Sequence, residues 1–395
     1  MTGGDGVFGY YLAATLARLG DEMVAFTLVL LVLERTDSPA LAGVTGAAYA
    51  LPAIVTGPLL GAWLDRTPRR RTALAANQAT LAVVMIAMLL AVGNSPHWTA
   101  PTLAAVAGTT LPMVSGGFTS MLPSLFGPDR LARANSFESV SFSAAAIAGP
   151  ATAATVTAAV SVDAAVVVIV VAAGLSIVAI SRLPALPPAG AGGEPFLASV
   201  VGGLRHLART PRLRASTVTT TLLMGFTGML LITLPLHMVE LGRPQSAAGY
   251  LWTAVELGSM TTALLLGHLQ RRWPPEYVVM LSVGAYGLAL ATWPLASSLV
   301  VLLLLALLTG LLEGPALPAM FAARQRYSPE ALQGRVSTTA ASLRVGASAL
   351  GQATAGLLVP ALGPGATMLV VALGLLAAVG LGRLSSLTTK VPVHA

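Results

Sequence analysis

Hydrophobic residues occur along this chain in twelve long runs, separated by short polar breaks or by breaks rich in proline and glycine. Each run is close to the roughly 20 residues that an α-helix needs to cross the hydrocarbon core of a bilayer. The pattern therefore predicts twelve membrane-spanning helices. Their expected ranges are 8–33, 39–64, 72–93, 99–126, 134–160, 164–183, 215–239, 245–269, 277–294, 299–322, 336–360 and 365–384.

The longest polar break, 184–214, follows the sixth run and divides the chain into six plus six. Its first part is a linker rich in proline and glycine. Its second part, 196–209, predicts an amphipathic helix that lies on the membrane surface. We therefore expect an all-α integral membrane protein with two pseudo-symmetric six-helix bundles, 1–183 and 215–395, joined by a cytoplasmic linker.

An internal repeat favours the same division. The stretch 43–66 aligns with 249–272, and the tetrapeptide PDRL at 128–131 aligns with PEAL at 329–332. These matches place related loops after the second and eighth spans and after the fourth and tenth. Repeats of this kind are frequent in transporters.

Composition narrows the function classes. Only 9% of the residues are charged, against about 25% in soluble domains, which excludes a soluble enzyme. The chain has no cysteine, no His-Glu-x-x-His, no Gly-x-Ser-x-Gly and no P-loop, so we expect neither an intramembrane enzyme nor an ATP-driven pump, and no metal or cofactor. Its basic residues lie in separate short loops, which is not the pattern of a nucleic-acid-binding surface.

The basic residues predict the orientation. If the N-terminus is cytoplasmic, eighteen Arg and Lys residues lie in inside loops and only Arg35 and Arg243 lie outside. This asymmetry follows the positive-inside rule. It predicts a multi-pass protein of the bacterial cytoplasmic membrane with both termini in the cytoplasm.

Apart from Arg182 and Arg383 at the inner ends of their spans, seven charged residues fall inside the predicted spans, where each costs about 2.5–3.5 kcal/mol at the bilayer centre. They are Arg18, Asp21, Glu22, Glu138, Glu256, Glu313 and Arg344. The first three are three and four residues apart and therefore share one face of the first span, together with Tyr11 and Thr15.

The charged face of the first span has two interpretations. As a functional site facing a cavity, it would bind a cation or carry a proton, and Glu22 is our first choice for the proton carrier. As a structural cluster, Arg18 would neutralise Asp21 or Glu22 permanently. Two acids for one base favour the functional interpretation.

The remaining intramembrane charges lie in the second half. Glu256 has no nearby base in the sequence and is either protonated or paired with another helix. As a cavity residue it would attract a cationic substrate or carry a proton; the alternative is a neutral, hydrogen-bonded carboxyl group packed between helices. Glu313 and Arg344 lie roughly 12–14 Å from the inner ends of consecutive spans, so we expect a static ion pair between them. The sequence Glu313-Gly-Pro315 also predicts a bend.

Short motifs resemble the major facilitator superfamily. The loop after the second span reads GAWLDRTPRRR, from Gly61 through Asp65 and Arg66 to the basic cluster that contains Arg70. It is similar to the family's loop motif, with Pro68 where glycine is usual. The segments RLGDE, ending at Glu22, and PDRLARAN, at 128–135, resemble the macrolide-efflux and enterobactin-exporter branch of drug:proton antiporters.

The fifth span carries a variant of the antiporter motif around Gly149 and Pro150, with alanine at three glycine positions. The arginine that many drug:proton antiporters carry in the fourth span is missing, because 99–126 contains no arginine. The resemblance therefore does not supply a proton-coupling arginine.

The resemblance also implies a cytoplasmic gate. In the superfamily, the loop-motif aspartate contacts the start of the eleventh span, which places Asp65 near Arg335. Pseudo-symmetry places Glu138 near Arg271 or Arg272. We expect two ion-pair latches that close the cytoplasmic side. The gate residues are Gly61, Asp65, Arg66, Arg70, Glu138, Arg271, Arg272 and Arg335.

These features predict a monomeric secondary transporter with protons and a small molecule as partners. Proton-coupled export of a bulky amphipathic or cationic compound (a drug, an antibiotic or a siderophore-like molecule) is favoured. Flipping of a lipid or lysolipid, and uptake of a small solute, remain alternatives. The expected cavity lining is rich in Met and aromatic residues, which suit varied apolar ligands. These residues are Tyr11, Phe26, Tyr49, Met113, Phe118, Met224, Phe226, Met229 and Trp252.

Overall fold

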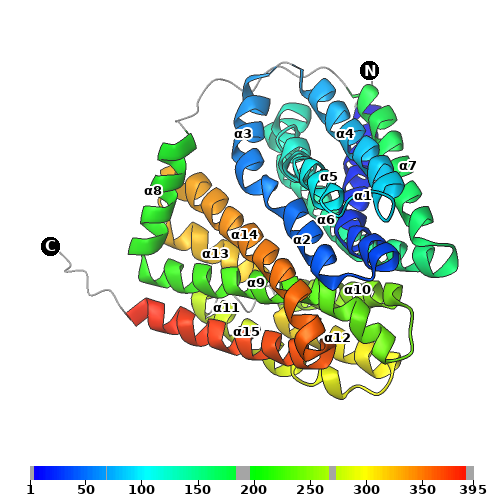
Figure 1. The fold of residues 1–395 in the computed structure, drawn as a ribbon. Coiled ribbons are helices and arrows are strands. Elements are labelled where there is room, and N and C mark those ends of the chain that lie inside the picture. The colour runs from blue at the N-terminus through cyan, green and yellow to red at the C-terminus, as the bar shows by residue number, and fades with distance from the viewer. Residues whose placement is uncertain (1–3, 68, 184–195, 267–272, 388–395) are drawn as a thin grey trace. The chain divides into compact units, whose positions relative to one another are not determined.

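The computed structural model describes residues 4–67, 69–183, 196–266 and 273–387 (Figure 1). Within these ranges the chain forms helices joined by turns and contains no β-strand, so the prediction of an all-α protein is confirmed. The chain packs as two compact units, described here one at a time. Unit 1 comprises Met1–Gly193 with Pro244–Thr253, and unit 2 comprises Glu194–Arg243 with Ala254–Ala395.

Unit 1 contains seven α-helices, a π-helical turn and the start of a later helix. They are α1 (Gly4–Thr36), α2 (Pro39–Ala50), α3 (Pro52–Arg66), α4 (Arg70–Ala91), α5 (Thr99–Gly108), the π-helix η1 (Met113–Gly117), α6 (Leu122–Ala159), α7 (Val162–Ser181), the 3₁₀ turn η2 (Gln245–Ala247) and the first residues of α10 (Ala248–Leu266). The predicted boundary between the bundles lay at the linker alone, whereas contacts group Pro244–Thr253 with unit 1.

Unit 2 contains the surface helix, the rest of α10 and the remaining helices. They are α8 (Phe196–Arg209), α9 (Pro211–Glu240), α11 (Pro275–Leu290), the 3₁₀ turn η4 (Trp293–Leu295), α12 (Leu299–Glu313), α13 (Ala316–Tyr327), α14 (Glu330–Leu362) and α15 (Pro364–Leu387). The predicted amphipathic helix at 196–209 is confirmed as α8.

Nine segments among the described residues are long and apolar enough to cross a membrane, and the count of twelve spans stays a prediction. Three expected spans are interrupted. Proline at the first position of α3 follows the break after α2, because proline cannot continue a helix but can start one. The turn η1 interrupts the fourth span. α12 ends at Glu313 and α13 begins at Ala316, which confirms the predicted bend.

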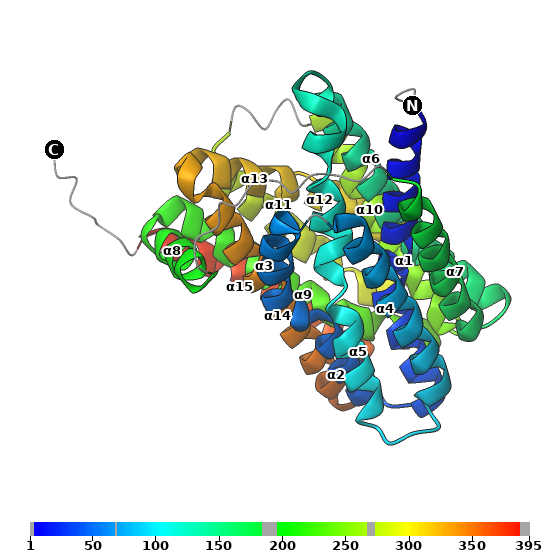
Figure 2. The same ribbon diagram turned by 90° about the horizontal axis from the view of Figure 1, so that it is seen from above.

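Each unit packs around one long helix of its own, α1 in unit 1 and α9 in unit 2 (Figures 1 and 2). In unit 1, α1 packs on α7, α6 and α2, and α4 packs on α7 and α5. In unit 2, α9 packs on α14 and α15, and α11 packs on α15, α12 and α13. The core around the start of α1 includes Tyr10, Ala17, Phe118, Met121 and Ile180, each no more than 1% exposed.

Glycine contacts recur in equivalent places of the two units. Gly108 of α5 lies against the carbonyl oxygen of Tyr49 in α2, and Gly310 of α12 lies against that of Val255 in α10. A Cβ at either glycine would overlap this oxygen, so the close approach needs glycine.

The second recurring contact joins the long helices. Gly149 of α6 lies against Glu22 of α1, and Gly351 of α14 lies against Gly225 of α9. Partners in both contacts are offset by 202 to 206 positions in the sequence. The internal repeat is therefore also present in the packing within each unit.

The surface helix α8 is docked on unit 2. Leu207 of α8 packs with Leu213, Val336 and Ala340, and His206 Nε2 lies 2.9 Å from the carbonyl oxygen of Tyr327. One side of α8 therefore lies against α13 and α14. Val201 and Leu204 of α8 are 62% and 49% exposed, so contact of these apolar side chains with the membrane surface stays a prediction.

Replacing Gly203 by Ala is expected to loosen α8. A Cβ at this position would lie 2.6 Å from the Arg335 carbonyl oxygen of α14, and overpacking of this kind costs about 1–3 kcal/mol. Hydrogen exchange followed by mass spectrometry should show roughly tenfold faster exchange across α8. Gly202→Ala is the matched control, because its Cβ would meet only the flexible end of Arg335, at 3.4 Å. Equal exchange in the two variants would contradict the prediction.

Candidate functional site

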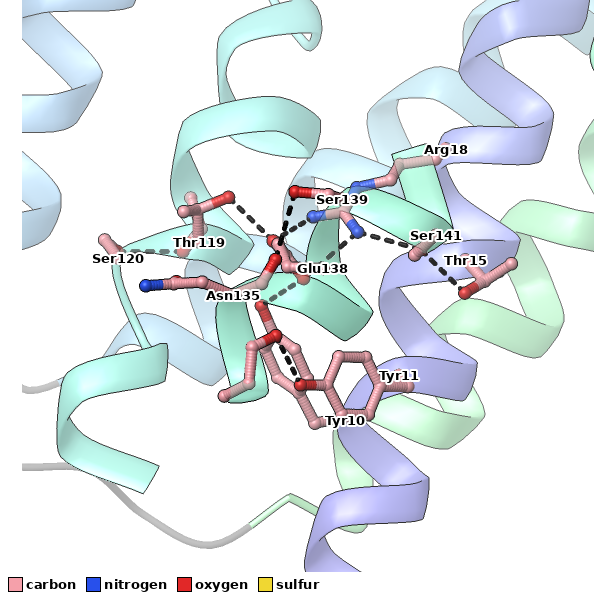
Figure 3. A network of polar contacts seen from close by, with 12 residues as sticks. Tyr10, Tyr11, Thr15, Arg18, Thr119, Ser120, Asn135, Glu138, Ser139 and Ser141 are labelled. Atoms are coloured by element: carbon pink, nitrogen blue, oxygen red, sulfur yellow. Dashed lines mark hydrogen bonds and ion pairs between the residues drawn. The ribbon is translucent and has the colours of Figure 1, made fainter. Parts of the chain in front are cut away.

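The centre of the candidate site is an ion pair between Arg18 of α1 and Glu138 of α6 (Figure 3). Nη2 of Arg18 contacts Oε1 of Glu138 directly, and Nη1 lies 3.2 Å from Oε2. The two side chains are only 2% and 6% exposed, and the guanidinium lies 3.8 Å from the centroid of the Phe142 ring. A bidentate pair of this kind is strong and geometrically specific.

Neutral donors and acceptors complete the network. Tyr10 donates a hydrogen bond of 3.1 Å and Thr119 one of 2.7 Å to the carboxylate of Glu138. Arg18 donates a 2.9 Å bond to Ser141 Oγ. Thr119 lies two residues after the end of the π-helical turn η1, a type of turn that is frequent at functional sites.

The predicted polar face of α1 contacts α6. The Tyr11 hydroxyl donates to the Ala134 carbonyl oxygen at 2.9 Å, and Thr15 Oγ1 lies 2.8 Å from Ser141 Oγ (Figure 3). Together with Arg18, these residues form one continuous polar contact between the two helices. The expectation that this face also borders a cavity stays a prediction.

The predicted pairing of Arg18 with Asp21 or Glu22 is corrected, since Arg18 pairs with Glu138. Helical side chains lean toward the N-terminus of their helix. Arg18 therefore leans away from two acids that follow it in the sequence, and an acid preceding the base is the better order within a helix.

Asp21 and Glu22 have different surroundings. The Tyr49 hydroxyl donates a 3.2 Å hydrogen bond to Asp21 Oδ1. Glu22 lies where α1 meets the antiporter-like segment of α6: a Cβ at Gly149 would lie 2.5 Å from Cβ of Glu22. Gly149 and Pro150 are both buried. The structure therefore brings the motif of the fifth span against the acid of the first span.

Unit 2 holds a second group of acids, which we call the acid pair, Glu256 of α10 and Glu313 of α12. Glu313 accepts a hydrogen bond from Ser259 and interacts electrostatically with Glu256. The expected ion pair between Glu313 and Arg344 is corrected: α12 crosses onto α10, and Nη1 of Arg344 lies 3.3 Å from Sδ of Met320.

The family follows from comparison with known proteins. The model of the Major Facilitator Superfamily matches residues 10–352 and 217–393. The chain belongs to this superfamily. An uncharacterized MFS-type transporter, y4rN of Sinorhizobium fredii, is 30% identical over 369 residues, covering 90% of this chain and 88% of that protein. The multidrug efflux pump Tap of Mycolicibacterium fortuitum is 28% identical, covering 92% of this chain and 91% of Tap.

Solved structures support the fold. The nucleoside transporter NupG superposes with a TM-score of 0.79, covering 99% of this chain and 100% of NupG, at 12% identity. Such low identity shows the fold alone. Membership of the Major Facilitator Superfamily makes this chain a multi-pass membrane transporter of a small molecule, and the family is not one of enzymes.

The loop motif of the superfamily falls at the junction of α3 and α4. Gly61, Asp65 and Arg66 lie in α3, which ends at Arg66, and Arg70 is the first residue of α4. Arg70 is 1% exposed, and its Nε donates a 3.1 Å hydrogen bond to the Leu64 carbonyl oxygen. Arg70 thereby satisfies a carbonyl group at the end of α3, a structural role at the expected gate.

Glu138 pairs with Arg18, both within unit 1, and its predicted latch to Arg271 or Arg272 stays a prediction. Arg18 of α1 reaches Glu138 because the polar faces of α1 and α6 meet. Arg271 and Arg272, the expected partners, lie outside the described residues. Arg335 of α14 lies against Gly202 and Gly203 of α8. Its predicted contact with Asp65 stays a prediction.

The expected cavity residues divide into two sets. Five are buried, because large side chains fill the helix crossings inside each unit: Phe26, Tyr49, Met113, Phe118 and Met229. These residues pack inside the units in this structure, and their predicted place in the substrate cavity stays a prediction. Four are partly exposed and keep the predicted role as a hypothesis: Tyr11, Met224, Phe226 and Trp252.

Sequence reasoning missed several polar residues of the sites. Ser141 follows Glu138 by three residues, so helical spacing could have placed both on one face. Tyr10 directly precedes Tyr11, but its helical position lies outside the polar face that was recognised in the first span. No signal linked Thr119 to this network. Arg324 was expected in a loop, whereas it lies buried in α13.

Proposed function

We propose that this transporter exports a bulky amphipathic compound in exchange for protons by alternating access. The compound is drug-like, antibiotic-like or siderophore-like. The transporter resides in the bacterial cytoplasmic membrane as a monomer, with both termini in the cytoplasm.

The acid pair carries this proposal. Glu256 and Glu313 belong to predicted spans, interact with each other, and form no ion pair with a base among the described residues. A carboxylate deep in the membrane is costly unless it is compensated, and uncompensated acids there mark proton pathways. Proton binding by one member removes the repulsion between them.

The first span supports the same mechanism. Arg18 is committed to Glu138, and Asp21 is held by the neutral hydroxyl group of Tyr49. Glu22 lies at the contact of α1 with the antiporter-like motif. We keep Glu22 as the proton carrier of unit 1. The relative named as a multidrug efflux pump supports export as the direction.

Transport into proteoliposomes tests proton coupling. An imposed pH gradient should drive accumulation of rhodamine B or another transported amphipathic dye by the unmodified protein. Glu22→Gln and Glu313→Gln should each reduce this gradient-driven rate about tenfold or more, because neither amide can carry the proton. Glu240→Gln is the control, because this side chain is half exposed at the end of α9. A rate that is independent of the gradient would rule out the coupling.

Cells test the substrate class. Expression in an efflux-deficient strain should lower the accumulation of amphipathic dyes or raise antibiotic resistance. Transport of a labelled lysolipid in place of the dyes would favour a flippase, and gradient-driven uptake of a polar solute would favour an importer. Either result would overturn export of an amphipathic compound.

A further inference from the structure

Two arginines from neighbouring helices of unit 2 converge on one sulfur atom. Nη2 of Arg324 in α13 lies 3.2 Å from Sδ of Met320, and Nη1 of Arg344 in α14 lies 3.3 Å from the same atom. We call Arg324 and Arg344 the arginine pair. Arg324 is 4% exposed and Met320 is 2% exposed.

The arginine pair has no acidic counter-ion among the residues that the structure describes. A thioether is only a weak acceptor. Arg324 also lies 5.7 Å from the centroid of the Phe321 ring. Nε of Arg344 is buried without any hydrogen-bond partner in the described ranges. These contacts leave most of the hydrogen-bonding capacity of two guanidinium groups unused.

Three other arginines of the chain each form an ion pair with an acidic residue. Arg18 pairs with Glu138, Arg35 with Asp163 and Arg212 with Glu276. Each of these three pairs supplies a carboxylate to a guanidinium. The arginine pair lacks one although Arg324 is among the most buried charged side chains.

Helix geometry compensates only part of this charge. Arg324 lies in the last turn of α13, where the carbonyl ends of the helix favour a cation. Arg344 lies in the interior of α14, far from either helix end. Arg324 is buried and Arg344 is partly buried. Two neighbouring cations repel each other, and burial of an uncompensated charge is expensive. An anion between them would remove both penalties.

We propose that the arginine pair binds an anionic group, a carboxylate or a phosphate, of the transported compound. Guanidinium groups bind such groups through two parallel hydrogen bonds, which gives geometric specificity. The inference rests on the proposed function and narrows its cargo to amphipathic compounds that carry an acidic group. Met320 fills the space between the two arginines when no anion is bound.

Binding to the purified, detergent-solubilised full chain tests the inference without any transport step. The probe is dansylglycine, an amphipathic dye with one carboxylate, followed by fluorescence anisotropy, with its neutral methyl ester as the uncharged counterpart. Dansylglycine should bind at least about tenfold more tightly than the ester. Arg324→Gln and Arg344→Gln should each weaken binding of the anion about tenfold and leave that of the ester unchanged.

The controls separate charge from folding. Arg326→Gln changes an exposed arginine of the same helix and should leave binding unchanged. Arg324→Lys keeps the charge and should lose less affinity than Arg324→Gln. Competition distinguishes the source of the anion: inorganic phosphate at millimolar concentration that displaces the dye as well as an organic carboxylate would overturn a cargo site in favour of a simple anion site.

Two further results would overturn the inference. One is equal affinity for dansylglycine and its ester, and the other is unchanged affinity in both Gln variants while each elutes as a folded protein. Because binding needs no gradient, failure of proton-driven transport with normal anion binding would contradict only the proposed function. Proton-driven transport of dyes with no anion preference would contradict only the inference.

Discussion

Replacing Glu138 by Gln is expected to destabilise the protein by about 3–5 kcal/mol, because it leaves Arg18 as a buried charge without a counter-ion. The side chains of this pair are 2% and 6% exposed, so water cannot replace the lost carboxylate. Thermal unfolding of the detergent-purified protein should show an apparent Tm lower by several degrees. Tyr10 and Thr119 would also lose a charged acceptor.

A double variant separates the loss of the pair from the loss of one charge. Arg18→Met combined with Glu138→Met removes both charges and should recover most of the stability, since apolar replacements of buried ion pairs are often neutral. Glu240→Gln breaks the half-exposed contact with His237 and should cost no more than about 1 kcal/mol. A double variant as unstable as Glu138→Gln would show that the individual hydrogen bonds, and not the charge balance, hold α1 to α6.

Replacing Gly149 by Ala is expected to destabilise the protein by about 1–3 kcal/mol and to impair gradient-driven transport. The added Cβ would lie 2.5 Å from Cβ of Glu22 and 3.1 Å from its carbonyl carbon. The helices α1 and α6 must then separate by a fraction of an ångström at the proposed proton carrier. Unfolding temperature and the proteoliposome assay measure the two effects.

Gly174→Ala is the matched control for Gly149→Ala. Gly174 lies within α7, and nothing approaches its Cβ position within 4 Å. Alanine there should stabilise the helix by up to about 1 kcal/mol through its higher propensity. If Gly149→Ala behaved in the same way as Gly174→Ala, the contact between α1 and α6 would be loose enough to absorb a methyl group.

Sequence patterns predicted the features that depend on local order. The amphipathic period gave α8 its bounds, and the Gly-Pro step after Glu313 located the break between α12 and α13. Both depend on neighbours along the chain. The loop motif and the antiporter-like segment were enough to identify the superfamily, because their residues are contiguous.

Contacts between distant helices were not predictable in the same way. Arg18 and Glu138 are 120 positions apart, and only the crossing of α1 and α6 brings them together. The expected pairing of Glu313 with Arg344 assumed that consecutive helices touch at equal depth. The glycine contact of α12 with α10 instead directs Glu313 toward Ser259. An aromatic residue such as Phe118 is equally typical of a binding surface and of a hydrophobic core, and in the structure it is buried in the core of unit 1.

The recurring glycine contacts are the same in both units, whereas the residues that they touch differ in chemistry. Gly149 meets Glu22 in unit 1, while the equivalent Gly351 meets Gly225 in unit 2. Gly108 meets Tyr49, whose hydroxyl holds Asp21, while Gly310 meets Val255. The residue opposite the glycine is thus a glutamate or a tyrosine in unit 1 and a glycine or a valine in unit 2. Two duplicated halves of this kind can therefore change their polar side chains, and with them the compound that is bound, while the glycine contacts between the helices are kept.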